Sequence, residues 1–113
     1  MALAKVWLEQ HGYDDIKDVS ADQSCDYWAT KNGTPKWIEI KGTTAGFGNI
    51  LMTANEVNLH RELHPDNVLI IVHNIDLVEA RTEATGGHLV ALEAWDVETA
   101  ELRALSYSCK LAV

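Results

Sequence analysis

The first hydrophobic pattern of the chain is helical. Leu3, Val6 and Trp7 recur at the spacing of one helix face, which predicts a helix over residues 2–11. Gly12 follows directly and suits the end of a helix, where the backbone often turns left-handed.

Strand-like alternation follows this helix. Residues 15–20 alternate Ile and Val with polar residues, which predicts a short strand. Two further strand-like runs flank Asn32 and Gly33, the dipeptide favoured in tight hairpin turns. These runs predict an antiparallel hairpin over residues 25–42.

The second half of the chain begins with a helix signal. Residues 53–56, Thr-Ala-Asn-Glu, have the form of a capping box and open a predicted helix that ends near Leu63. The later expectations are a strand buried on both faces at 67–74, a loop with a little helix at 77–86, a strand at 88–95 and an edge strand at about 104–111. The order α-β-β-β-α-β, then a further β-rich section, predicts an α/β fold with a mixed sheet and helices against it.

Length and composition are those of one globular domain, residues 1–113. The 113 residues are 47% hydrophobic and 23% charged, and no apolar run approaches the roughly 18 residues of a membrane span. The N-terminus lacks the long apolar stretch of a signal peptide. The two cysteines, Cys25 and Cys109, are then typical of reduced thiols. We expect a soluble, cytoplasmic protein with no membrane partner.

Charge changes this picture. The formal net charge is -8, whereas proteins that bind nucleic acid tightly and nonspecifically are usually basic. Residues 1–64 hold nine acids against six Lys and Arg, and residues 65–113 hold eight against three. A surface for polyanions would therefore lie in the N-terminal part, where some acids are candidate metal ligands. Charge alone favours a domain that does not bind nucleic acid.

The predicted hairpin gathers charged residues on one face. With a two-residue turn at Asn32-Gly33, Asp26 lies opposite Glu39, at a Cβ separation of about 4.5–5.5 Å. Because side chains alternate along a strand, Lys41 points to the same side as Glu39. Two carboxylates and one ammonium are thus expected to converge.

Opposed carboxylates destabilise a sheet unless a cation lies between them. Lys41 is one candidate, and Mg²⁺ or Mn²⁺ is another, because magnesium is often held by one or two carboxylates together with water and a substrate phosphate. The carbonyl of Ile40 is a candidate further ligand. Lys41 would then orient the attacking water or stabilise charge on the phosphorane. The alternative is a surface hairpin whose acidic pair is neutralised by Lys41.

These residues also carry a resemblance. Asp26, twelve residues, and then Glu39-Ile40-Lys41 have the form of the PD-(D/E)xK nuclease signature. More narrowly, Ile-Glu-Ile-Lys-Gly-Thr at 38–43 and the capping-box residues resemble the NO VEIN C-terminal domain, within a likeness that extends over about residues 3–74. The resemblance implies a restriction-endonuclease-like fold, a mixed central sheet flanked by helices. It also implies metal-dependent cleavage of phosphodiesters, or a degenerate relative of that activity.

The resemblance has departures. Ser24 and Cys25 precede the acidic position, where such domains usually have Gly-Tyr or Pro-Tyr. Some resolvases of the superfamily place a helix Glu in the site, and Glu9 is the only acid of the first predicted helix. Glu9 is therefore a candidate extra ligand, with a solvated helix residue as the alternative.

Other residues near the site have two interpretations each. Glu56 is a partner of the metal site or a capping residue. Asn55 either binds the scissile strand of the nucleic acid or is simply a residue suited to a helix start. Thr43, Thr44 and Trp37 are candidate nucleic-acid contacts, through backbone amides or base stacking. Their alternatives are a surface loop and a cross-strand aromatic pair with Trp28.

The remaining candidates are interpreted as structural. His60 and His64 lie four residues apart on the predicted helix, without a third ligand in an obvious motif, so we expect surface histidines. Cys25 is expected to point into the core as a small apolar residue.

Three functions remain open. The leading hypothesis is a metal-dependent nuclease that hydrolyses DNA, as a module of a larger restriction, defence or repair protein, with a homodimer supplying two sites. The second is an inactive nuclease-like domain that binds protein or nucleic acid, which the acidity and Ser24-Cys25 favour. The third is a purely structural domain, which the cost of opposed carboxylates opposes.

Overall fold

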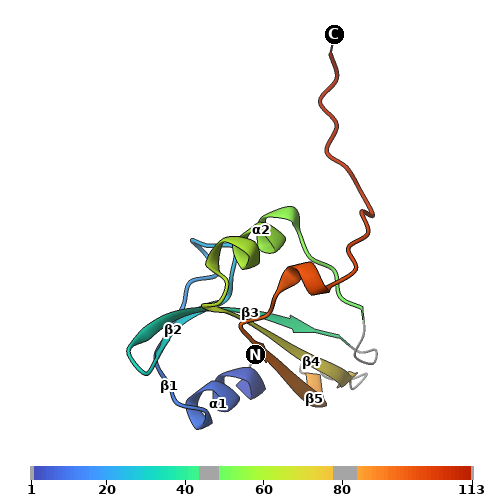
Figure 1. Cartoon of the computed structure of the whole chain (residues 1–113). Helices are drawn as coiled ribbons and strands as arrows, with labels where there is room; N and C mark the ends of the chain where they lie inside the picture. Colours follow the sequence, from blue (N-terminus) through green and yellow to red (C-terminus); the bar gives the residue numbers. More distant parts are fainter. Residues whose placement is uncertain (1, 44–48, 78–83, 113) are drawn as a thin grey trace.

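The computed structural model of the chain describes residues 2–43, 49–77 and 84–112, and its strands there form one mixed sheet with a helix on each face (Figure 1). The elements, in chain order, are α1 (Ala2–Gln10), β1 (Tyr13–Asp18), β2 (Tyr27–Lys31), β3 (Thr34–Gly42), α2 (Ala54–Leu63), β4 (Asn67–Leu77), β5 (Ala84–Glu93) and the short 3₁₀ helix η1 (Val97–Thr99). The predicted α/β class and element order are confirmed.

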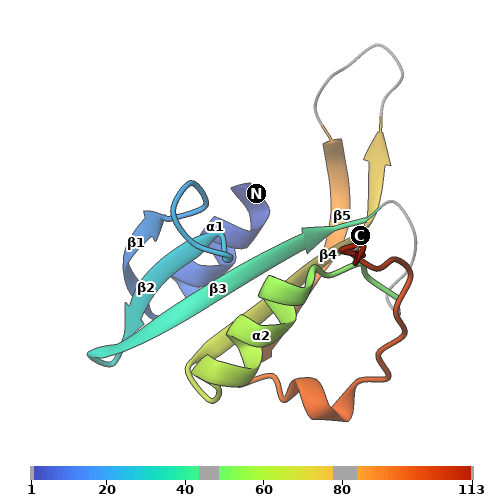
Figure 2. The same cartoon turned by 90° about the horizontal axis from the view of Figure 1, so that it is seen from above.

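The strands lie in the order β1-β2-β3-β4-β5. β3 and β4 are parallel, and the other neighbours are antiparallel. Parallel strands need a crossover connection, and α2 lies within that connection. Seen from above, α2 runs along β3 and β4 (Figure 2). The crossover therefore brings the start of α2 close to the end of β3.

The β2–β3 hairpin follows from its turn residues. Asn32 and Gly33 both have positive φ, 53° and 77°, as a type I′ turn requires. This turn sets the predicted register, in which Trp28 pairs with Trp37 and Lys31 pairs with Thr34.

The main core lies between α1 and the sheet. Ala4 and Leu8 of α1 pack with Ile38 of β3 and with Val68 and Ile70 of β4, all of which are buried. Side chains alternate along β3, so Glu39 and Lys41 point to the opposite face, toward α2. The sheet thus separates the apolar core from the charged residues that the sequence singles out.

The α2 side of the sheet buries a histidine. His60 is fully buried, its Nδ1 lies 2.8 Å from Nδ2 of Asn67, and its ring meets Trp95 edge-on at 5.1 Å between centroids. The prediction of a surface histidine is wrong for His60. Trp95, which follows β5 in the sequence, packs against the His60 ring and covers this face of α2. Burial lowers the pKa of His60 to about 4. His64 is exposed, as expected.

Two sequence predictions about the second half are wrong. β4 extends to Leu77 and β5 begins at Ala84, so both ends of the predicted 77–86 loop are strand, and 78–83 lie outside the described residues. Residues 100–112 form no strand and extend away from the sheet (Figure 1). Their alternation resembled an edge strand, but Leu105 and Tyr107 are 65% and 86% exposed and pair with no edge.

Cys25 is buried, as expected, Cys109 is exposed, and neither forms a disulfide. No helix in the described part of the chain is long and apolar enough to span a membrane.

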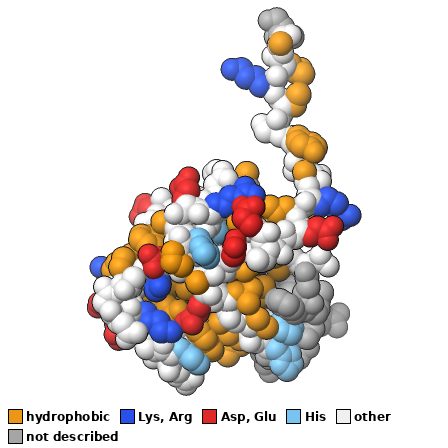
Figure 3. Space-filling model, in the orientation of Figure 1, with side chains coloured by type: hydrophobic (Ala, Val, Ile, Leu, Met, Phe, Trp, Pro, Cys, Tyr) orange, Lys and Arg blue, Asp and Glu red, His pale blue; other side chains and the backbone are white. Residues whose placement is uncertain are grey.

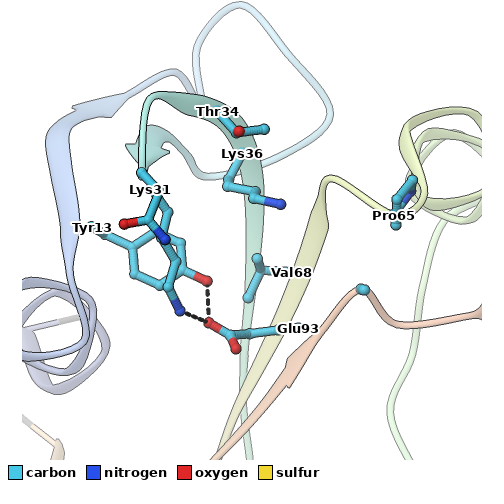
Figure 4. A pocket seen from close by; sticks show the side chains of 9 residues that line it. Tyr13, Lys31, Thr34, Lys36, Pro65, Val68 and Glu93 are labelled. Atoms are coloured by element: carbon cyan, nitrogen blue, oxygen red, sulfur yellow. Dashed lines mark hydrogen bonds and ion pairs between the residues drawn. The ribbon is translucent and has the colours of Figure 1, made fainter.

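One polar cluster joins three strands on the α1 face. Tyr13 of β1 and Lys31 of β2 both donate hydrogen bonds to Oε1 of Glu93 in β5, and Lys31 Nζ lies 2.7 Å from that oxygen (Figure 4). The cluster borders a hollow of about 310 Å³. Tyr13 is only 3% exposed, and its burial raises its pKa. Glu93 therefore accepts a hydrogen bond from the Tyr13 hydroxyl, which is buried away from water.

This cluster predicts the effect of Glu93→Ala. The substitution leaves the buried Tyr13 hydroxyl without its acceptor, so we expect the free energy of unfolding to fall by about 1–3 kcal/mol. Chemical denaturation measures this loss. The control is Glu98→Ala, because Glu98 is 66% exposed in its pair with Arg61 and such pairs contribute about 1 kcal/mol at most. Equal losses in the two variants would contradict the assignment.

Candidate functional site

The candidate site lies at the carboxyl-terminal half of β3. The pairing of β2 with β3 stops at Tyr27 and Ile38, so among the described residues only β4 pairs with Glu39–Gly42. The β2 side of this part of β3 is consequently open. Asp26, the residue just before β2, lies at this opening.

Asp26 takes the place of the missing strand partner. Its backbone N–H donates to the carbonyl of Ile38 at 2.9 Å, and its Oδ2 accepts from the backbone N–H of Ile40 at 2.7 Å. The sequence predicted that Asp26 would pair directly with Glu39. The structure differs, because the regular ladder ends one residue earlier and the carboxylate turns toward the β3 backbone.

The backbone of β3 alternates between its two neighbours. Trp37 and Thr43 donate their N–H groups, at 3.0 and 2.9 Å, to carbonyl oxygens at and just before β4. In a strand, the N–H and C=O of one residue point to the same side, and successive residues alternate. Ile40 therefore turns both groups toward the open β2 side, where Asp26 lies. The predicted use of the Ile40 carbonyl as a ligand agrees with this direction.

Glu39 is a buried carboxyl group on the α2 face. It is 4% exposed, and its Oε1 lies 3.4 Å from Nζ of Lys41. A carboxyl group removed from water is costly unless it is paired or protonated. The groups around Glu39 therefore determine whether its carboxyl group is ionised.

Lys41 bridges from β3 to the start of α2. Its Nζ lies 2.9 Å from both carboxylate oxygens of Glu56. Glu56 also completes the capping box: its Oε1 accepts from the N–H of Thr53 at 2.8 Å, and its own N–H donates to the Thr53 hydroxyl at 3.1 Å. The interpretation of Glu56 as a capping residue is therefore confirmed, and the same carboxylate also binds Lys41.

The same surroundings shift the pKa values of Glu39 and Glu56 in opposite directions. Burial raises the pKa of Glu39 to about 8, and a hydrogen bond with Glu56 and the charge of Asp26 add to the rise. Burial also raises the pKa of Glu56, but hydrogen bonds from Glu39, Thr53 and Lys41 outweigh it and lower that pKa to about 2. Around neutral pH, Glu39 thus holds a proton that it donates to ionised Glu56. Burial opposes the charge of Lys41, but its two Glu partners still raise its pKa.

Carboxylate and carbonyl oxygens are the donors that a hard divalent cation prefers. Asp26 lies at the open edge, its charge acts on Glu39, and the Ile40 carbonyl points to the same edge. Within the described residues, no three His, Cys, Asp or Glu side chains are grouped to hold a metal ion. A site with Asp26 and Glu39 as its carboxylates would therefore need other oxygens, from water or substrate, to complete the shell of an ion such as Mg²⁺.

The other candidate residues lie at different places in the structure. Glu9 is exposed on α1, which packs on the opposite face of the sheet, so it is not brought to the site. Asn55 is exposed on the first turn of α2, and Trp37 is half-buried two residues before Glu39. Thr43 continues the pairing with β4. Thr44 lies outside the described residues.

Sequence reasoning missed how close Cys25 lies to the charged site. Burial, Glu39 and Asp26 together raise the pKa of the Cys25 thiol to about 11. The thiol is therefore protonated at neutral pH and is a poor nucleophile. Its signal in the sequence, adjacency to Asp26, does not by itself distinguish a core residue from a site residue.

Surface charge near the site is mixed. On the face shown in Figure 3, acidic and basic side chains lie next to one another, without a continuous basic stripe. Lys36 pairs with Asp66, and Arg61 pairs with Glu98. The face shown in Figure 3 therefore offers no simple electrostatic track for a duplex backbone.

The raised pKa of Glu39 predicts a pH dependence of stability in metal-free protein. The folded state holds this proton more tightly than the unfolded state. The resulting stability is complete below about pH 4.5 and is lost as pH rises through about 8. Glu39→Gln keeps a neutral hydrogen-bonding group, so from about pH 5 to 9 its stability should rise relative to wild type, on the order of 1 kcal/mol.

Chemical denaturation across this pH range, with a chelator present, measures the difference. Glu9→Gln is the matched control, because Glu9 is exposed on α1. A stability difference between Glu39→Gln and wild type that stays constant with pH would contradict the shared-proton arrangement.

Comparison with known proteins gives one match. The family model described as "Protein NO VEIN, C-terminal" matches residues 4–85, which include Asp26, Glu39, Lys41 and Glu56. No curated protein matches the chain, and no solved structure matches it. The family takes its description from the C-terminal part of another, longer protein, which agrees with the expectation of a domain that occurs within larger proteins. Because the match covers most of its residues, this chain belongs to the NO VEIN C-terminal family.

Proposed function

We propose that this domain is a metal-dependent nuclease that hydrolyses phosphodiester bonds of DNA. The observation that supports it most is the convergence of Asp26, Glu39, Lys41 and the Ile40 carbonyl at the open edge of β3. A structural domain gains nothing from burying Glu39 beside two further carboxylates. The convergence is therefore better explained by a site that binds a cation and a phosphate.

Each residue has a role in this proposal. Asp26, Glu39 and the Ile40 carbonyl would hold Mg²⁺ or Mn²⁺. The ion would supply Lewis-acid stabilisation of charge on the phosphate and would lower the pKa of a bound water. Lys41, which carries three N–H donors, orients the attacking water or donates to a phosphate oxygen as negative charge builds. Glu56 would hold the Lys41 ammonium in place through both of its carboxylate oxygens.

The fold is consistent with this reading. We infer a restriction-endonuclease-like arrangement, because a mixed sheet carries Glu39-Ile40-Lys41 on β3, Asp26 directly precedes the neighbouring strand β2, and a crossover helix follows. Open α/β sheets bind ligands at the carboxyl ends of parallel strands, and the site lies at that end of β3. A net charge of -8 offers little grip on DNA, so we propose that the domain works within a larger restriction, defence or repair protein, or as a homodimer with two sites.

One observation favours a second function. Both oxygens of Glu56 bind Lys41 at 2.9 Å, and Glu39 is hydrogen-bonded to Glu56, so all three groups are satisfied within the protein. Such a closed cluster would also suit a nuclease-like domain without turnover that binds protein or nucleic acid. Activity measurements separate the two functions.

Metal binding and cleavage test the proposal together. Calorimetric titration with Mn²⁺ or Mg²⁺ should give binding that Asp26→Asn and Glu39→Gln both abolish. Asp26→Asn replaces a carboxylate with a neutral amide, and Glu39→Gln removes a carboxyl group that can lose its proton to the incoming ion. Asp26→Asn keeps an oxygen that can accept from Ile40, so the fold should persist. Lys41→Met should bind metal but cleave plasmid or single-stranded DNA slower by about 100-fold or more.

The matched control is Glu101→Gln, an exposed residue that follows η1 and lies outside the charged cluster, which should leave binding and cleavage unchanged. Metal binding without cleavage of any DNA substrate would favour the inactive binding domain. The absence of metal binding at millimolar concentration would contradict the proposal.

A further inference from the structure

A groove of about 410 Å³ lies beside the charged site, between the start of β3 and α2. Trp37 lines it and precedes Glu39 by two residues on the same face of β3, a separation of about 7 Å along the strand. Asn55, which directly precedes Glu56, lines the groove from α2. The groove and the charged site are therefore built on the same two elements, β3 and α2.

The lining combines an aromatic ring with amide groups. The Trp37 side chain is half-buried, and Leu59 and Leu63 of α2 add partly buried apolar surface beside it. Asn55 and Asn58 are exposed at the rim. Each amide offers both donors and an acceptor, and no side-chain hydrogen bond engages either one within the described part of the chain.

The charge of the groove indicates which part of a ligand it suits. Glu62 is the one charged side chain among its lining residues, and neither Lys nor Arg lines it. A phosphate would find no cation there. A nucleobase is neutral and planar, with a hydrogen-bonding edge, and base–aromatic stacking contributes about 1–3 kcal/mol per base. The lining thus suits a nucleobase better than the phosphate backbone of a nucleic acid.

We propose that this groove binds an unpaired base of single-stranded DNA, stacked on Trp37 and hydrogen-bonded by Asn55 and Asn58. This inference rests on the proposed function, since it places the base next to the phosphodiester that reaches Asp26 and Glu39. A base in a duplex is already stacked and paired, so the groove selects single strands or flipped-out bases. Binding through bases also reconciles DNA recognition with a net charge of -8.

Fluorescence anisotropy of a labelled oligothymidylate, at low salt with a chelator, tests this without any cleavage. We expect measurable binding that Trp37→Ala weakens about tenfold or more, that Trp37→Phe largely retains, and that Asn58→Ala weakens several-fold. Asn58 is exposed on α2, so its variant should fold normally. Gln10→Ala, an exposed amide on α1, is the matched control and should bind like wild type.

A second arm identifies the group that is bound. One abasic position is moved along the oligonucleotide; at one place it should weaken binding as much as Trp37→Ala, and combining the two should add little. Unchanged affinity in Trp37→Ala and Asn58→Ala, or equal affinity for a duplex, would overturn the proposal. Because no metal is present, Trp37-dependent binding supports the base site even if the domain fails to cleave DNA, and cleavage without Trp37-dependent binding overturns this inference alone.

Discussion

The hydrogen bond from the Ile40 N–H to the Asp26 carboxylate is the interaction on which the site depends. It spans 2.7 Å and closes a backbone position that β2 leaves without a partner. An unpaired backbone N–H in this half-buried place would cost about as much as a lost hydrogen bond. Asp26 meets this demand and leaves the edge of β3 open, which a continued β2 strand would have closed. The early end of β2, with Asp26 in place of a further strand pair, therefore leaves this side of β3 open.

Around this opening, the protein gathers charges that it must keep neutralised. Glu39 is removed from water, and its proton, the ammonium of Lys41 and the carboxylate of Glu56 form a cluster without a net excess of charge. Replacing such a buried charged cluster with apolar side chains commonly costs no stability and can raise it. Stability alone is thus a weak reason for these residues. The cation binding that we propose would give a stronger one, because it would explain why the carboxylates lie together.

Local sequence signals predicted much of this arrangement. The Asn32-Gly33 turn fixed the hairpin register, since both residues adopt the positive φ that the turn requires, and the capping box of Thr53 and Glu56 located the start of α2. The departure of Asp26 from the hairpin ladder could not be predicted, because it depends on where the preceding loop leaves the sheet. The burial of His60 depends on Trp95, which lies far away in the sequence, so helical spacing carried no sign of it. Alternation in the C-terminal tail resembled a strand because periodicity does not say whether an edge is available.

A metal site at the open edge of β3 can be tested by a Mn²⁺ titration of ¹⁵N-labelled protein followed by NMR, because a bound paramagnetic ion broadens the nearest backbone amides. We expect the amides of Asp26, Glu39, Ile40 and Lys41 to broaden first, at Mn²⁺ concentrations well below that of the protein. In Asp26→Asn the same amides should stay sharp. Broadening that begins instead at exposed acids such as Asp14 and Asp15, or that is equally weak across the surface, would contradict a metal site at the open edge of β3.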